Sequence, residues 1–333
     1  MKNFRRIDKK EAQKLLDKVP FKTFFHSLQW HEFLEKEFRW MKFEYYTYND
    51  EALLPLARFK VFGKEKLISL PFCEYGGSLP IKSGIKFEEF EKDIFSEFKE
   101  NIKIKFHPEI LKYFGKQQTT KNGQNCDVFT SWIENLKNTN EEQLLASFRK
   151  TLRYEIRDAQ QKDLLIKKCE NLKELKQFYN LYVINLKRKK TVPYPFSIFE
   201  FLYHNPDTEI ILAVFRDKVI GGNLFVNYGK FIHYFFSASD YNYKDFGVSY
   251  LLLWSKMKDL IGRDKILDLG ATPKDSSLDV FKRGWGGKEY PILQLGIKKS
   301  SEKLRVSKLR NLWGLLPNFA IRKLGPLLIK YRI

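Results

Sequence analysis

The hydrophobic pattern of the first 138 residues predicts a mixed arrangement of helices and strands. Apolar residues recur at helical spacing in three segments, which are 8–19, 28–38 and 87–100. Shorter apolar or alternating runs predict strands at 43–48, 52–62, 67–72, 102–106 and 127–133. A turn at Asn49-Asp50 joins the first two strands, and His107-Pro108 starts a further helix.

A polar, turn-rich segment at 135–140 separates this part from the rest of the chain. Thr139 and Glu142 have the spacing of a capping box, which predicts one long helix over 141–161. The later pattern predicts helices at 171–190, 196–204 and 247–261 and strands at 164–168, 209–215, 219–226, 230–237, 265–269 and 290–298.

The two halves repeat one order of elements. In each, two helices precede a three-stranded meander, and a helix and a strand follow it. We therefore predict an α/β (mixed α+β) fold of two tandem domains, each with a largely antiparallel sheet flanked by helices. The expected domains are 1–138 and 139–299, followed by a basic amphipathic helical tail at 300–333.

The charge balance indicates what kind of partner the protein binds. The chain has 60 Lys and Arg against 40 Asp and Glu, so its formal net charge is +20. Such an excess, spread along the chain, indicates an anionic partner: nucleic acid, a phosphate-bearing cofactor or an anionic membrane face.

Cysteine and histidine usage argues against several classes of site. Cys73, Cys126 and Cys169 lie far apart, which disfavours a disulfide framework and a zinc site and is typical of a reducing cytoplasm. The five histidines are scattered, so no metal site is expected. The N-terminus does not resemble a signal peptide, and no apolar run is long enough to span a membrane.

The tail leaves two alternatives. It has a single acidic residue, Glu302, and two prolines that interrupt it, Pro317 and Pro326. Its apolar residues include Leu309, Leu312, Trp313, Leu315, Leu316, Phe319, Leu324 and Leu327. A basic amphipathic segment of this kind either lies on an anionic membrane surface or packs back on its own domain.

The segment 268–287 is the first candidate for chemistry. Asp268 ends a buried strand, and Phe281-Lys282 leads into an aromatic-glycine turn that contains Trp285. A lysine held between two aromatic residues near a strand end suits an active site of an α/β protein. A helix end closed by glycines, with basic residues favouring the helix dipole, is the alternative.

Two basic clusters are candidates for phosphate binding. Arg149, Arg153 and Arg157 recur every four residues on the predicted 141–161 helix, and arginine binds phosphate through two parallel hydrogen bonds. A solvated face paired with nearby carboxylates is the alternative for these three. Lys244, Gly247 and Ser249 open the helix at 247, where free backbone amides suit a bound phosphate. An ordinary glycine-containing helix start is the alternative.

Motifs for a catalytic serine, a Walker loop and a dinucleotide fingerprint are absent from the sequence. This favours transfer between two bound substrates, held by positioning and charge.

An ordered series of motifs gives a resemblance. The series is Leu70-Pro71-Phe72, Tyr75-Gly76-Gly77, Arg153 and Arg157, Val219-Ile220-Gly221-Gly222, Tyr234, Asp268-Leu269-Gly270, Phe281-Lys282 and Trp285-Gly286-Gly287. In this order it resembles FemAB-like proteins, which belong to the GNAT acyltransferase superfamily.

The resemblance implies two tandem GNAT-like domains and the transfer of an aminoacyl or acyl group, with aminoacyl-tRNA or acyl-CoA as donor and no tightly bound cofactor. It implies a role for Phe281-Lys282 near the transferred group and binding of the precursor by Arg153 or Arg157. With these residues we expect a catalytic role for Tyr234 and substrate binding by Arg149, Tyr75, Gly76, Gly77 and Asp268. Lys244, Gly247 and Ser249 only approximate the CoA loop of GNAT enzymes and are the expected donor-binding residues. One departure is Leu34, where Fem-type transferases often have a lysine.

Three functions are therefore carried forward. The first is acyl or aminoacyl transfer to an amine of a cell-envelope precursor, either a peptidoglycan peptide or a polysaccharide amino sugar. The second is an acyl-CoA-dependent N-acyltransferase of exopolysaccharide synthesis. The third is a non-catalytic basic module that binds nucleic acid or anionic lipid. The expected location is the cytoplasm, peripheral to the inner membrane face if the tail contacts lipid.

Overall fold

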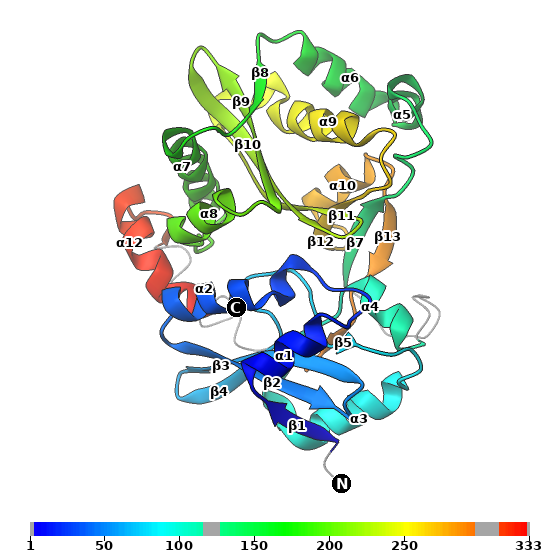
Figure 1. Cartoon of the computed structure of the whole chain (residues 1–333). Coiled ribbons are helices and arrows are strands. Elements are labelled where there is room, and N and C mark those ends of the chain that lie inside the picture. The colour runs from blue at the N-terminus through cyan, green and yellow to red at the C-terminus, as the bar shows by residue number, and fades with distance from the viewer. Residues whose placement is uncertain (1–2, 116–126, 297–312, 332–333) are drawn as a thin grey trace. The chain divides into compact units, whose positions relative to one another are not determined.

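The computed structural model describes residues 3–115, 127–296 and 313–331, and Figure 1 shows its elements along the chain. The chain folds into two compact units. The first comprises Met1–Thr130, Ala271–Lys274 and Glu289–Ser300, and the second comprises Ser131–Gly270, Asp275–Lys288 and Ser301–Ile333. The division at residues 138 and 299 expected from the sequence stays a prediction.

The first unit is built on one mixed sheet with the strand order β1-β2-β3-β4-β6-β14, and β5 pairs with β3. All of its pairings are antiparallel except the β4–β6 pairing, which is parallel. Its strands are β1 (Phe4–Ile7), β2 (Met41–Tyr48), β3 (Ala52–Val61), β4 (Lys64–Ile68), β5 (Leu79–Pro80), β6 (Ile102–Lys105) and β14 (Gln294–Leu295). Its helices are α1 (Lys9–Leu16), η1 (Phe24–His26), α2 (Leu28–Glu37), α3 (Phe87–Phe98), η2 (Lys99–Asn101) and α4 (Pro108–Tyr113).

The second sheet has the order β13-β7-β12-β11-β10-β9-β8. Its strands are β7 (Val128–Ile133), β8 (Leu165–Lys168), β9 (Thr208–Phe215), β10 (Lys218–Tyr228), β11 (Phe231–Ser239), β12 (Ile266–Pro273) and β13 (Lys288–Pro291). The helices of this part are α5 (Glu141–Ser147), α6 (Lys150–Gln160), α7 (Leu172–Arg188), α8 (Phe196–Tyr203), η4 (Tyr241–Phe246), α9 (Val248–Leu260), α10 (Ser277–Arg283), α12 (Asn318–Leu328) and η5 (Ile329–Tyr331).

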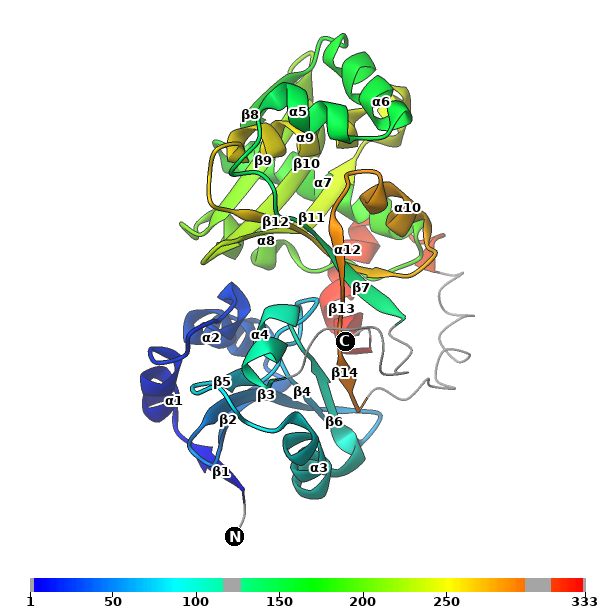
Figure 2. The same cartoon turned by 90° about the vertical axis from the view of Figure 1, so that its right-hand side faces the viewer.

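Two neighbouring glycines of β10 show how helices cover both faces of the second sheet. A Cβ on Gly221 would lie 2.3 Å from Val248 of α9, and one on Gly222 would lie 2.6 Å from Phe178 of α7. Because successive residues of a strand point to opposite faces, α9 and α7 lie on opposite sides of the sheet. Helix α6 packs on α9, and α8 packs on α7 (Figure 2).

The two sheets follow the same path. The first runs β1, α1, α2, β2, β3, β4, α3, β6 and α4, and the second runs β8, α7, α8, β9, β10, β11, α9, β12 and α10. In both, three antiparallel pairings are followed by one parallel pairing across a helix. The predicted mixed, largely antiparallel architecture is therefore confirmed, and the repeat extends to the strand directions.

The single helix predicted over 141–161 is wrong. Helix α5 ends at Ser147 and α6 begins at Lys150, because Phe148 and Arg149 adopt extended backbone with ψ values of 152° and 151°. Phe148 is buried and packs edge-on against Trp254 and Trp285. The burial of Phe148 in the core explains why the helix breaks here, although the break contains neither proline nor glycine.

Smaller differences concern caps and strand ends. The capping box of α5 is formed by Asn140 and Gln143, one residue after the predicted pair. The strand predicted over 67–72 ends at Ile68, since Leu70 and Phe72 have φ values of 53° and 65°, which no strand accommodates. The last predicted strand is two short strands, β13 and β14, and its residues after 296 lie outside the described part of the chain.

The described part of the tail is the helix α12, which packs against α7. Gly325 lies at this junction, where a Cβ would be 3.3 Å from the carbonyl oxygen of Pro193. Leu309 and Leu312 lie outside the described residues. Within the described residues, none of the helices has the length and apolar character needed to cross a membrane.

Candidate functional site

The site begins where two parallel strands stop pairing. Strands β11 and β12 pair from Phe231 and Ile266 to His233 and Asp268. Beyond this point β11 continues to Ser239 and β12 to Pro273 without further pairing to each other. In α/β proteins, ligands bind outside the carboxyl ends of parallel strands, where backbone and side-chain groups are left free to contact them.

Asp268 organises the last paired position. Its side chain is fully buried and accepts hydrogen bonds from His233 Nδ1 at 3.0 Å, from the Tyr228 hydroxyl at 3.4 Å and from the Gly270 amide at 2.9 Å. The carboxylate therefore links β12 to β11 and holds the backbone of β12 at Gly270, whose φ is 78°. These contacts make Asp268 a positioning residue, and its predicted contact with substrate stays a prediction.

Lys282 lies beside Gly270. It belongs to α10, whose start is capped by Ser276 and whose Asp279 carboxylate accepts two hydrogen bonds from Arg283. Lys282 is only 3% exposed, and its Nζ donates to the Gly270 carbonyl oxygen at 2.9 Å. The structure thus places the predicted lysine on a short helix, beside the part of β12 that follows its pairing with β11.

Tyr234 is the first residue of β11 beyond its pairing with β12. Its hydroxyl donates to Asn223 Oδ1 at 3.3 Å, and its ring stacks on Phe225. Burial raises the pKa of Tyr234 to about 12, so the phenol is protonated at neutral pH. In that form it donates a proton or a hydrogen bond and does not act as a base.

Asn223 was not identified from the sequence. It is fully buried, and its Nδ2 donor has no hydrogen-bond partner among the described residues. Buried donors are usually paired in folded proteins, so this amide beside Tyr234 is a candidate contact for a bound substrate. An asparagine in the middle of a strand gives no such signal before the register is known.

A β-bulge lies beside Tyr234. Leu224 of β10 is opposite Phe236, whereas the next residue, Phe225, is opposite Tyr234, so Phe235 is the extra residue. Bulges bend a strand and re-aim its side chains, and they are common next to active sites. His233 and Tyr228 were missed in the same way, because their pairing with Asp268 depends on the strand register.

Helices α9 and α10 pack beside these groups. Phe281 of α10 packs against Tyr250 of α9 at 5.5 Å between ring centroids and against Trp285 at 6.1 Å. Tyr234 and Phe281 both pack against the same hydrophobic cluster. The structure therefore places Phe281 and Tyr234 on one hydrophobic cluster, and it places Lys282 against the carbonyl of Gly270, two residues after Asp268.

The three predicted arginines do not form one row. Arg149 precedes α6, and its Nη2 donates to the Val280 carbonyl of α10 at 3.4 Å. Arg153 donates to the Ala146 carbonyl at 3.3 Å, which satisfies the end of α5. Arg157 is exposed on α6 and has no ion pair among the described residues. Phosphate binding by these arginines stays a prediction.

The predicted donor-binding residues lie at the start of α9. Gly247 precedes the helix with a φ of 63°, and a Cβ there would lie 2.7 Å from Cβ of Ala159 in α6. Its conformation and its packing both require glycine. No side chain caps α9, so the amides near Ser249 face outward from the helix start, and Lys244 is exposed on η4. Phosphate binding here stays a prediction.

Tyr75, Gly76 and Gly77 pack within the first unit. Tyr75 is buried, and its hydroxyl lies 3.4 Å from Thr130 Oγ1. Gly77 has a φ of 96°, and a Cβ on it would lie 2.7 Å from the Phe106 ring. Their predicted contact with substrate stays a prediction. Packing within the first unit alone explains why a tyrosine and two glycines occupy these positions.

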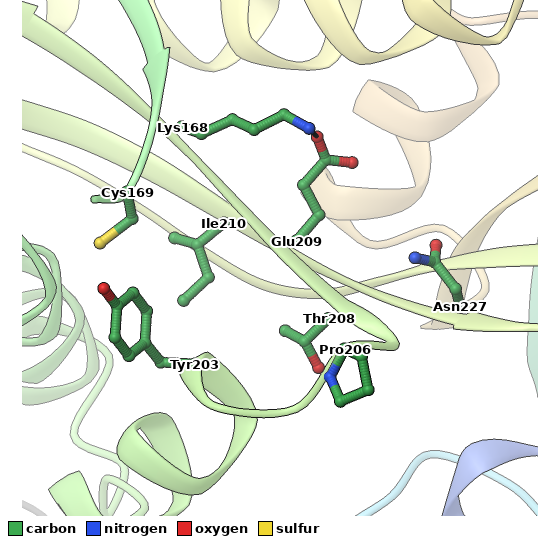
Figure 3. A pocket seen from close by; sticks show the side chains of 8 residues that line it. All are labelled: Lys168, Cys169, Tyr203, Pro206, Thr208, Glu209, Ile210 and Asn227. Atoms are coloured by element: carbon green, nitrogen blue, oxygen red, sulfur yellow. Dashed lines mark ion pairs between the residues drawn. The ribbon is translucent and has the colours of Figure 1, made fainter. Parts of the chain in front are cut away.

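A pocket of about 260 Å³ lies at the other end of the second sheet and includes none of the predicted residues. Figure 3 shows Lys168 paired with Glu209 on one side, and Tyr203 with Cys169 on the other. Burial raises the pKa of Cys169 to about 11, so its thiol is not a nucleophile at neutral pH. Glu209 is also paired with Lys256, so the pocket presents no reactive group.

Comparisons with known proteins agree with this geometry. Residues 146–283 match the family of acetyltransferase (GNAT) domains, and this range contains Tyr234, Asp268 and Lys282. A search of curated proteins found no match.

Solved structures resemble nearly the whole chain. FemX is 15% identical, with a TM-score of 0.58 over 92% of this chain and 99% of FemX. L-PGS from Bacillus licheniformis is 11% identical, with a TM-score of 0.52 over 93% of this chain and 98% of L-PGS. The C-terminal domain of a putative lysylphosphatidylglycerol synthetase from Agrobacterium fabrum is 10% identical, with a TM-score of 0.51 over 91% and 96%. At these identities the likeness is one of fold.

Residues 146–283, which include the strands β8 to β12 and the helices α6 to α10, therefore form an acyltransferase domain of the GNAT type. Taken with the FemX-like fold of nearly the whole chain, this match supports the resemblance to FemAB-like proteins that the ordered motifs indicated.

Proposed function

We propose that this acyltransferase transfers an activated aminoacyl or acyl group to an amine of a cell-envelope precursor. The observation that carries the proposal is the position of Lys282 and Tyr234 at the point where β11 and β12 part. Both groups are hydrogen-bond donors at neutral pH, and both are fixed by neighbouring residues. Such preorganised donors are what the charge of an acyl-transfer intermediate requires.

The proposed chemistry has two steps. The neutral amine of the acceptor attacks the carbonyl carbon of the donor, and the carbonyl oxygen becomes an oxyanion that Lys282 Nζ stabilises. The intermediate then collapses, the bond to the donor's oxygen or sulfur breaks, and an amide forms. The leaving oxygen or sulfur accepts a proton from Tyr234, and the phenol regains one from the proton that the amine releases. One well-placed donor contributes on the order of 3 kcal/mol to such a step.

The anionic parts of both substrates have candidate contacts. Arg157, which is exposed on α6, and Arg153 beside it are proposed to bind a phosphate of the acceptor. The uncapped start of α9, with Lys244 before it, is proposed to bind a phosphate of the donor. Leu34 is fully buried in α2, so the lysine that Fem-type transferases often have there has no equivalent at this position.

Two observations favour different donors. The fold shared with FemX supports an aminoacyl group from aminoacyl-tRNA and a peptidoglycan-type acceptor. The acetyltransferase match over 146–283 and the uncapped α9 support the second candidate, an acyl-CoA-dependent transfer to an amino sugar of an exopolysaccharide. The non-catalytic alternative, a basic module for nucleic acid or lipid, gives no reason for a buried lysine at a strand end.

The test offers both donors to the whole protein. Acetyl-CoA and alanyl-tRNA are each incubated with a nucleotide-linked muramyl peptide or a nucleotide-linked amino sugar, and amide formation is followed by mass spectrometry. We expect one donor to be consumed in step with amide formation. Salt-dependent binding of RNA without transfer of any group from either donor would contradict the proposal and favour the non-catalytic module.

We also propose that the protein acts at the inner face of the membrane, where lipid-linked envelope precursors are presented. The basic tail supports this location, because eight Lys and Arg and no acidic residue occur between Lys303 and Ile333.

A further inference from the structure

Helix α12 has one side that is anchored to the protein. Ile321, Gly325 and Ile329 are spaced four residues apart, and all three are buried. This side packs on α7, with Gly325 against Pro193. The helix, drawn in red in Figure 1, is therefore held on α7 by this side, and its exposed residues lie on the opposite side.

The opposite side is apolar. Phe319 is 69% exposed, Leu327 66%, and Leu324 and Tyr331 39% each. At about 100° per residue Phe319, Leu324 and Leu327 of α12 fall within an arc of about 140°, centred opposite the buried side, and Tyr331 follows in η5. Large apolar side chains that gather on the exposed side of a packed helix mark a contact with a partner or a membrane.

Cations are interspersed with these apolar residues. Lys323 and Lys330 fall within the same arc, and Arg322 is exposed beside it. The described tail, residues 313–331, contains no Asp or Glu that could pair with them. The surface of α12 therefore combines exposed apolar area with uncompensated positive charge.

The combination of exposed apolar area and positive charge distinguishes among the possible binding partners of α12. A second copy of the chain would place cations against cations. A nucleic acid would use the cations and leave Phe319 and Leu327 in water. An anionic bilayer satisfies both features, because headgroup phosphates pair with lysines while apolar side chains enter the acyl boundary.

We propose that the solvent-facing side of α12 docks on the surface of an anionic lipid bilayer. Phe319, Leu324 and Leu327 enter the boundary between headgroups and acyl chains, and Lys323 and Lys330 contact the headgroups. The helix lies in the plane of the membrane, while its other side stays packed on α7. This inference rests on the membrane location proposed above, and its test measures lipid binding without turnover, so that its failure leaves the proposed transfer reaction untouched.

The test uses the full chain and sedimentation with vesicles at about 0.15 M salt. We expect binding to vesicles that contain phosphatidylglycerol, and much weaker binding to pure phosphatidylcholine. The double variant Phe319→Ser/Leu327→Ser should weaken binding to the anionic vesicles at least about tenfold. The double variant Lys323→Glu/Lys330→Glu should abolish the preference for anionic lipid.

Two matched controls distinguish lipid binding by this surface from nonspecific effects of removing any exposed leucine or reversing any exposed charge. Leu165→Ser removes a leucine that is 60% exposed on β8, and Lys60→Glu reverses an exposed charge on β3. Both should bind vesicles as the natural protein does, and melting temperatures should confirm that every variant is folded.

Three results would overturn the proposal. The natural protein could fail to bind phosphatidylglycerol vesicles under these conditions. The Phe319→Ser/Leu327→Ser variant could bind as tightly as the natural protein, which would assign lipid binding to another surface. Light scattering could show a dimer that the same variant dissociates, which would make this side of α12 an interface between two copies.

Discussion

At the scale of single residues, burial gives Lys282 a structural role as well as the proposed catalytic one. An exposed lysine at a helix end can be removed without cost, whereas Lys282 is 3% exposed and bonds the Gly270 carbonyl. Removing the whole side chain would leave a cavity and an unpaired acceptor, at a cost of about 1–3 kcal/mol. A test of catalysis must therefore keep the apolar stem.

We expect Lys282→Met to reduce transfer by at least about a hundredfold, because the oxyanion loses its charged donor. Methionine fills most of the lysine's volume, so the melting temperature should fall by only a few degrees. Lys274→Met, an exposed lysine a few residues before α10, is the control and should retain full activity. Retained transfer in the Lys282 variant would contradict its proposed role.

For Asn223 we expect a substitution to affect transfer much more than stability. Its Nδ2 is buried without a partner among the described residues, and its Oδ1 accepts a 3.3 Å hydrogen bond from Tyr234, whose hydroxyl also contacts Ser237, so Asn223→Leu should lower the melting temperature only slightly while lowering transfer about tenfold or more. Asn205→Leu is the matched control, since Asn205 is buried but accepts a hydrogen bond from the Asp207 amide, and it should lose stability. If Asn223→Leu instead destabilised the fold as much as the control does, a ligand-binding role would be refuted.

At the scale of elements, the sequence predicted most helices and strands but not the contacts that decide their ends. Phe148 breaks the predicted long helix because it fits between Trp254 and Trp285, which lie more than a hundred residues later in the chain. The pairing of His233 with Asp268 depends on the register of β11 on β12, and the bulge at Phe235 changes the register of β11 on β10. Hydrophobic periodicity predicts which side of an element is buried, but it does not predict which residues that side will contact.

The junction of α6 and α9 offers a test of such packing. Gly247→Ala should destabilise the protein by more than Gly229→Ala, although both glycines have positive φ values, 63° and 55°. A Cβ at position 229 meets nothing within 4 Å, whereas one at 247 lies 2.7 Å from Ala159. The change at 229 costs about 1 kcal/mol for its conformation, and the change at 247 adds the displacement of α6. Equal losses in chemical denaturation would show that α6 is not packed tightly against α9.

At the scale of the whole molecule, the sequence predicted the repeated order of elements, but it did not predict how the two sheets differ in function. The meanders and the helices that flank them predicted two similar sheets, and the strand directions confirm this. The sequence could not show that the second sheet alone has its parallel strands parting beside a buried lysine. In the first sheet, Lys112 of the equivalent helix α4 is exposed and paired with Glu109.

The first unit should be the more sensitive to acid. Burial lowers the pKa of His26 and of His31 to about 3, so both are neutral in the folded state and gain protons on unfolding below pH 6.5. Stability is therefore complete above about pH 6.5 and is lost as the pH falls towards 3, by up to about 1.4 kcal/mol per pH unit for each histidine.

Hydrogen exchange at about pH 4 should accordingly show peptides of residues 1–115 opening before those of 141–270. His31→Gln should reduce the slope of stability against pH by about half, and His204→Gln, an exposed histidine, is the control that should not change it. Earlier opening of the second unit would contradict this account.

The pairing of β14 with β6 has a consequence for the order in which the protein is made. β14, at Gln294–Leu295, completes the edge of a sheet whose other strands end at Lys105. The ribosome therefore synthesises roughly 190 further residues, over about 10–40 s, before this strand arrives. Until then β6 exposes unpaired backbone groups to every neighbouring nascent chain. An N-terminal fragment cut at the end of the first repeat should keep that open edge permanently and aggregate when it is expressed alone.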